Sequence, residues 1–118
     1  MTIGAPVIYS SQAYKASDGV LASPMTLQLA EGYNPNGSAL FLLYFNLAAV
    51  PGGGAVPLFG QLVPGGASFS WAPIDVSSAG QEGRKFSIAC SWGISSTGNV
   101  YTPSASAFWV DITGRRLT

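Results

Sequence analysis

Side chains of two kinds alternate with a period of two in segments such as 86–92 and 108–112, and turns rich in Gly and Pro separate the candidate strands of the chain. A period of two places successive side chains on opposite faces of a β-strand, and helical periodicity is nearly absent. The turn-forming Gly and Pro residues recur roughly every 8–15 residues, a spacing typical of an all-β sandwich or barrel. The pattern predicts strands over residues 6–9, 12–17, 25–31, 39–47, 56–63, 67–71, 85–95 and 107–113.

The segment 40–45 differs from the other predicted strands because it is apolar on both faces. A strand of this kind is covered on both sides, so we expect it in the middle of the core. We expect chain reversals at residues 34–37, 17–19 and 97–99, where Asn, Asp, Thr and Pro adjoin Gly. About eight short strands are enough for two sheets. The sequence therefore predicts an all-β fold: a single domain over residues 1–118, built as an antiparallel β-sandwich of jelly-roll-like topology.

The predicted strand 85–95 has one apolar face and one face of small side chains. We expect the apolar face to be buried and the small face to be accessible. A flat face of Ser and Ala either lets another subunit approach closely or forms an ordinary exposed sheet, and both interpretations stay open. The apolar set is Phe86, Ile88, Cys90 and Trp92, and the small set is Ser87, Ala89 and Ser91.

The last predicted strand, 107–113, directs Trp109 and Asp111 away from its apolar face. Because Trp is enriched at the centres of protein interfaces, Trp109 is a candidate anchor for a partner, and the alternative is a place in the core. Arg115 and Arg116 follow in a tail that either frays or reaches a partner. The apolar face consists of Phe108, Val110 and Ile112, and the candidate interface residues are Trp109, Tyr101, Arg115 and Arg116.

Charged residues are scarce in this chain of 118 residues. They make up 8% of it, with a net charge of zero, whereas an average soluble protein has roughly 25%. A monomer with so few surface charges tends to self-associate, but a subunit that is covered by its neighbours needs fewer charges for solubility. We therefore expect an oligomer or a component of a larger assembly. The alternative is a monomer with a polar, uncharged surface.

The side chains required for most catalytic and metal sites are missing. The chain has no His, which excludes Ser-His-Asp and Cys-His arrangements and removes the commonest general base near pH 7. Cys90 is the only cysteine, so we expect a small buried apolar side chain there and neither a disulfide nor a zinc site. We expect no metal, no cofactor and no enzymatic activity.

Nucleic acid and membrane partners are not expected either. A chain with zero net charge has no basic stripe to neutralise phosphates. No apolar run approaches the roughly 18 residues that span a bilayer. The first residues show no signal-peptide pattern, so we expect synthesis in a cytoplasm.

Two ligand-directed alternatives depend on how the fold gathers side chains. A glycosidase needs two acids that face one cleft, but four of the five acids are predicted at turns or strand ends. Carbohydrate binding is the main rival, because small β-sandwiches often present Trp and Tyr side chains that stack on sugar rings. The acids are Asp18, Glu31, Asp75, Glu82 and Asp111, and the tryptophans are Trp71, Trp92 and Trp109.

Several segments resemble small β-rich proteins encoded among the structural genes of tailed bacteriophages and prophages. In those proteins a strand end is followed by Leu/Val-Pro, a Gly turn and a second Pro, and later by an Arg-Phe-Ser strand leading into Ser-Thr-Gly. Where this chain has Asn46, the group often has an acid. The similar segments are FNLAAVPGGGAVP, VPGGASFSW, GRKFSIACSWGISSTGNVYT and AFWVDI, and KASDGVLASPMTL fits the Lys-Ala-Ser-x-Gly opening of the group.

This resemblance implies a virion component that binds by surface complementarity and brings no catalytic signature with it. The first expectation is a decoration or cement protein on the capsid. The alternative is a receptor- or carbohydrate-binding domain of a tail or head fibre. Such proteins are commonly trimers, so we expect a homo-oligomer, with a trimer favoured. Its partners would be capsid or other virion proteins, and it would be located in the virion after synthesis in the host cytoplasm.

Overall fold

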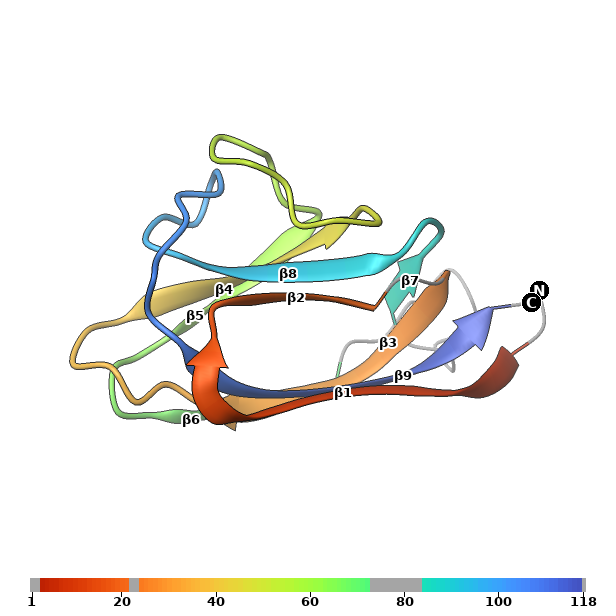
Figure 1. Cartoon of the computed structure of the whole chain (residues 1–118), viewed down its shortest axis with the longest axis horizontal. Coiled ribbons are helices and arrows are strands. Elements are labelled where there is room, and N and C mark those ends of the chain that lie inside the picture. Colours follow the sequence, from red (N-terminus) through yellow and green to blue (C-terminus); the bar gives the residue numbers. More distant parts are fainter. Residues whose placement is uncertain (1–2, 22–23, 73–83, 118) are drawn as a thin grey trace.

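Two antiparallel sheets pack face to face and enclose the core between them (Figure 1). This computed structural model describes residues 3–21, 24–72 and 84–117, of which 3–16 and 115–117 are described by their backbone alone. The strands within these ranges are β1 (Ile3–Ala16), β2 (Asp18–Leu21), β3 (Met25–Tyr33), β4 (Leu40–Asn46), β5 (Phe59–Val63), β6 (Ser68–Trp71), β7 (Arg84–Phe86), β8 (Cys90–Ser95) and β9 (Phe108–Leu117).

The strands pair in a nested order. β1 pairs with β9, β2 with β8, β3 with β6, and β4 with β5, all of them antiparallel. Rolling one long hairpin into two layers produces this nesting, and the result is a jelly roll. The five-stranded sheet has the order β1-β9-β3-β6 with β7 beside β3, and the four-stranded sheet has the order β2-β8-β4-β5. The predicted fold class, an all-β antiparallel sandwich of jelly-roll topology, is confirmed.

The N-terminal strand boundaries differ from the prediction. The predicted strands 6–9 and 12–17 form one continuous strand, β1, and the predicted turn at 17–19 is only a bend at Ser17. After this bend the chain leaves the five-stranded sheet and enters the other sheet as β2, where Gly19 lies opposite Trp92. The prediction missed β2 because Asp18 and Gly19 are typical turn residues.

The predicted strand 85–95 consists of two strands, because its halves belong to different sheets. β7 pairs with β3, whereas β8 pairs with β2 and β4. Asn46 holds the turn between them, since its Oδ1 accepts hydrogen bonds from the N–H groups of Ile88 (2.8 Å) and Ala89 (3.3 Å). The prediction of a small accessible face is therefore wrong at two of its three positions, because Ala89 and Ser91 are fully buried, whereas Ser87 is exposed as expected. Ile88, expected in the core, is 53% exposed at the turn.

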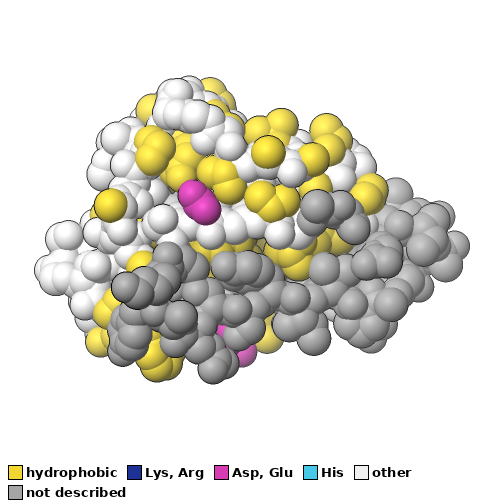
Figure 2. Space-filling model, in the orientation of Figure 1, with side chains coloured by type: hydrophobic (Ala, Val, Ile, Leu, Met, Phe, Trp, Pro, Cys, Tyr) yellow, Lys and Arg dark blue, Asp and Glu magenta, His cyan; other side chains and the backbone are white. Residues whose placement is uncertain are grey.

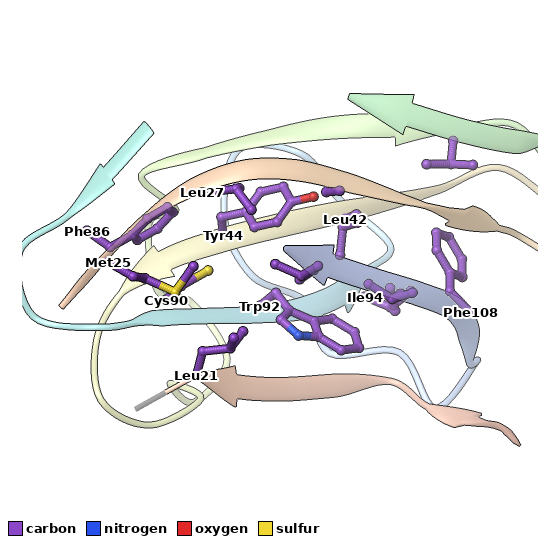
Figure 3. Close-up of a cluster of buried hydrophobic side chains, with 14 of the residues drawn as sticks. Leu21, Met25, Leu27, Leu42, Tyr44, Phe86, Cys90, Trp92, Ile94 and Phe108 are labelled. Atoms are coloured by element: carbon purple, nitrogen blue, oxygen red, sulfur yellow. The ribbon is translucent and has the colours of Figure 1, made fainter. Parts of the chain in front are cut away.

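Side chains from both sheets fill the main core (Figure 3). Burial raises the pKa of the Cys90 thiol to about 12. The thiol therefore stays protonated at neutral pH and acts as a small apolar side chain, as predicted. The other side chains that the alternation correctly placed in the core are Phe86, Trp92, Phe108, Val110 and Ile112.

β4 is buried on both faces, as the sequence predicted. Its even-numbered apolar side chains belong to the main core, and its odd-numbered ones belong to a second apolar cluster on the other side of the sheet. There the loops 47–58 and 96–107 cover the sheet (Figure 1). Two backbone hydrogen bonds of 2.7 Å join these loops, from Gly54 to Tyr101 and from Tyr101 to Ala55. The four-stranded sheet thus has a covered outer face.

One buried side chain, that of Asn34, holds the predicted reversal after β3. Its Nδ2 donates to the carbonyl oxygens of Ser38, Val63 and Pro64 at 3.1, 3.1 and 3.2 Å. Its Oδ1 accepts from the N–H of Asn36 at 2.9 Å. Asn34 therefore ties the connection between β3 and β4 to the turn between β5 and β6.

Candidate functional site

The fold does not bring the four candidate interface residues together. Trp109 lies near the start of β9 on the five-stranded sheet, whereas Tyr101 lies beneath the loops on the four-stranded sheet. Arg115 and Arg116 follow Trp109 along β9 by six and seven residues, which corresponds to about 20 Å or more. Tyr101 and the other three candidates therefore lie on different layers of the sandwich.

Tyr101 is a core residue, which corrects its assignment to an interface. Its side chain is 3% exposed, and its ring lies 5.3 Å from that of Phe45, centroid to centroid. Burial, and secondarily the charge of Asp18, raises the pKa of the phenol. The second apolar cluster needs this ring to fill the space beneath the loops, so it is not available to a partner.

The C-terminal tail is part of the sheet, so its description as a frayed end is wrong. β9 continues to Leu117, and Arg115 lies opposite Pro6 on β1 and Thr26 on β3. Arg116 lies opposite Met25. The side chains of Arg115 and Arg116 lie outside the described part of the structure, so their predicted role in an interface stays a prediction.

Trp109 lies on the outer face of the five-stranded sheet, in a shallow depression of about 780 Å³. Its side chain is 36% exposed. Tyr33 lies directly opposite it on β3, and Ser68 lies opposite Tyr33 on β6. We call this depression the Trp109 groove. It is lined by Glu31, Gly32, Tyr33, Ser68, Phe69, Ser70, Trp109 and Asp111.

A row of acidic and hydroxyl side chains runs beside this aromatic row. Glu31 lies opposite Asp111 on β9, and Ser70 lies opposite Glu31 on β6. Residues two apart on one face of a strand are about 6.8 Å from each other. The Trp109 groove therefore has an aromatic half and an acidic half within the reach of one small ligand.

The sequence prediction placed Trp109 and Asp111 on one face of the last strand but did not bring Tyr33 next to them. It ended the strand at Glu31, whereas β3 continues to Tyr33. The alternation extends through Gly32 to Tyr33. Gly32 occupies an inward position but has no side chain, so the hydrophobic pattern ends before it. The close approach of β3 and β9 requires this glycine, because a Cβ there would collide with the carbonyl oxygen of Trp109.

The other layer of the sandwich is nearly without charge. No charged residue occurs between Glu31 and Asp75 or between Lys85 and Asp111. These two stretches contain β4, β5, β8 and both covering loops. We call the four-stranded sheet with the loops 47–58 and 96–107 the low-charge layer. Asp18 on β2 is its single charged residue.

Exposed apolar side chains gather on this same layer. Leu47, Val56 and Leu58 line one shallow depression of about 300 Å³ beside the end of β4. On the face drawn in Figure 2, hydrophobic side chains recur over the upper layer, and no Lys or Arg is visible among its coloured atoms. Among the described residues, the large hydrophobic side chains exposed on or beside this layer are Leu47, Val56, Leu58, Leu62, Ile88 and Val100.

Within residues 3–21, 24–72 and 84–117, no three Cys, Asp or Glu side chains are placed to hold a metal ion. The same ranges contain no helix that is long and apolar enough to cross a membrane. Comparison of the chain with protein-family models, curated proteins and solved structures finds no match.

Proposed function

We propose that this chain is a structural subunit of a tailed bacteriophage particle, a capsid decoration or cement protein that docks through its low-charge layer. The observation that carries the proposal is the coincidence of two properties on one layer. That layer has a single charged residue, and it exposes several Leu, Val and Ile side chains. Neighbours that cover it would be other copies of this chain, in a trimer, and proteins of the shell.

The energetics of association favour this layer over the opposite one. Burying apolar surface contributes roughly 25 cal/mol per Å², and a standard interface buries about 1,600 Å². Burying charges costs free energy unless they are well paired, and this layer offers one charge instead of many. Val56 is 76% exposed, the largest exposed fraction among these hydrophobic residues, so a partner can bury most of it. Many copies on one shell would add to the attachment through multivalency.

The five-stranded sheet would then face outwards. The charged residues on its described strands are Lys15, Glu31, Arg84, Lys85, Asp111, Arg115 and Arg116. Charges of both signs on an exposed sheet keep an assembled particle soluble. We propose that the subunit binds and assembles without catalysing a reaction.

The number of copies in purified virions tests this function. We expect quantitative mass spectrometry to find the polypeptide in hundreds of copies per particle, because a decoration protein repeats with the shell lattice. A few copies per particle would contradict a place on the shell and favour the tail or fibre alternative. Absence from particles would contradict any structural role.

A further inference from the structure

We propose that the Trp109 groove binds a neutral oligosaccharide. The groove lies on the five-stranded sheet, on the opposite layer from the surface proposed for assembly. Binding at the groove therefore does not depend on assembly through the low-charge layer. Each of the two proposals can fail while the other holds.

The aromatic half of the groove suits the apolar face of a sugar ring. Trp109 and Tyr33 lie directly opposite each other on neighbouring strands, and both line the groove. Rigid aromatic rings on a sheet lose little conformational entropy when a flat ligand stacks on them. Tyr33 and Trp109 thus provide a platform for the C–H face of a pyranose, and the volume of about 780 Å³ lies within the range of small-molecule sites.

The acidic half suits the hydroxyl groups of the same ligand. The carboxylates of Glu31 and Asp111 accept hydrogen bonds, and the hydroxyls of Ser68 and Ser70 both donate and accept them. Hydrogen bonds to ionised carboxylates are stronger than those between neutral groups. A sugar stacked on Trp109 would place hydroxyls about 6.8 Å away along the strand, over the row of Glu31 and Asp111.

The charge of the groove selects among ligands. The acidic side chains of Glu31 and Asp111 disfavour phosphates and uronic acids, so we expect anionic polymers not to bind. A cation bound by aromatic rings must lie within about 6 Å of their centroids, and the attraction is strongest where water is excluded. The Trp109 groove is shallow and open, and serine hydroxyls line one side of it. An uncharged polyol satisfies all of these groups at once.

Ligand titrations followed by tryptophan fluorescence and saturation-transfer NMR test this site. The probes are maltotetraose, cellotetraose, chitotetraose with all its N-acetyl groups and β-1,4-galactotetraose, with tetragalacturonate and choline as charged counterparts. We expect at least one neutral probe to bind at millimolar concentration or below, and neither charged probe to bind. Trp109→Ala and Glu31→Gln should each weaken binding about tenfold or more.

Two comparisons distinguish an effect on binding at the groove from an effect on folding. Glu31→Gln keeps the shape of an exposed side chain, so its effect would not come from unfolding. Leu62→Ala, on the opposite layer, should bind as tightly as the unchanged protein. Binding of no neutral probe, binding of choline instead, or unchanged affinity in Trp109→Ala would overturn the proposal. Cleavage of a bound probe would support binding at the groove but contradict the proposed absence of catalysis, because the acid pair would then be catalytic.

Discussion

Asn34→Asp is expected to lower the free energy of unfolding by about 4 kcal/mol, the loss typical of an uncompensated buried charge. The amide Nδ2 donates to the carbonyl oxygens of Val63 and Pro64, among others, from a fully buried position. A carboxylate oxygen there would face those carbonyl oxygens without a proton to share. Domains of this kind are stable by roughly 5–15 kcal/mol, so much of the stability would be lost. Urea unfolding followed by tryptophan fluorescence measures the change.

Asn99→Asp is the matched control, because Asn99 is exposed in the loop 96–107. The same chemical change there should alter the free energy of unfolding by less than about 0.5 kcal/mol. Equal stability of Asn34→Asp and the unchanged protein would show that the Asn34 hydrogen bonds do not hold the connections together. In that case the ordering of both turns would need another cause.

Gly32→Ala is expected to destabilise the fold by about 3 kcal/mol, because the added methyl group would clash with backbone atoms, which cannot move aside as a flexible side chain can. The new methyl group would collide with the carbonyl oxygen of Trp109 and lie 3.1 Å from the ring of Phe69. Backbone atoms of β9 cannot move away without loosening their pairing with β3. The same displacement would disturb the floor of the Trp109 groove, so saccharide affinity should fall as well. Thermal and urea unfolding give the stability.

Gly52→Ala provides the control for backbone freedom, because nothing lies within 4 Å of a Cβ at that position. We expect the free energy of unfolding of this variant to change little, or to rise slightly because Ala makes the unfolded chain less flexible. If Gly32→Ala were as stable as Gly52→Ala, then β3 and β9 would not need their close approach. The description of the groove floor would then be wrong.

Much of the fold follows from local pattern. The double-sided apolar segment at β4 predicted a strand buried on both faces, and the alternation in β9 separated buried Val110 from exposed Trp109. These features depend only on the period of two and on hydrophobicity, so a single sequence contains them. The turn after β3 was also predictable, because Asn, Pro and Gly there have specific backbone preferences.

The remaining features depend on contacts between distant segments. Nothing local indicates that the chain changes sheets at Ser17 or that strand 85–95 divides between two layers. Glu31 and Asp111 are far apart in sequence, and only the pairing of β3 with β9 makes them neighbours. The scarcity of charge was visible from composition, but its concentration in one layer required the nested pairing of β2, β4, β5 and β8.

Sedimentation equilibrium of the purified protein tests most directly whether the low-charge layer is an interface between copies of this chain. We expect the unchanged chain to form a complex of about three chain masses of 12.2 kDa each. Leu58→Asp, which places a charge on the exposed apolar surface, should shift it towards the monomer, whereas Ser70→Asp on the opposite layer should not. A wild-type chain that sediments as a 12.2 kDa monomer at every concentration would contradict the account.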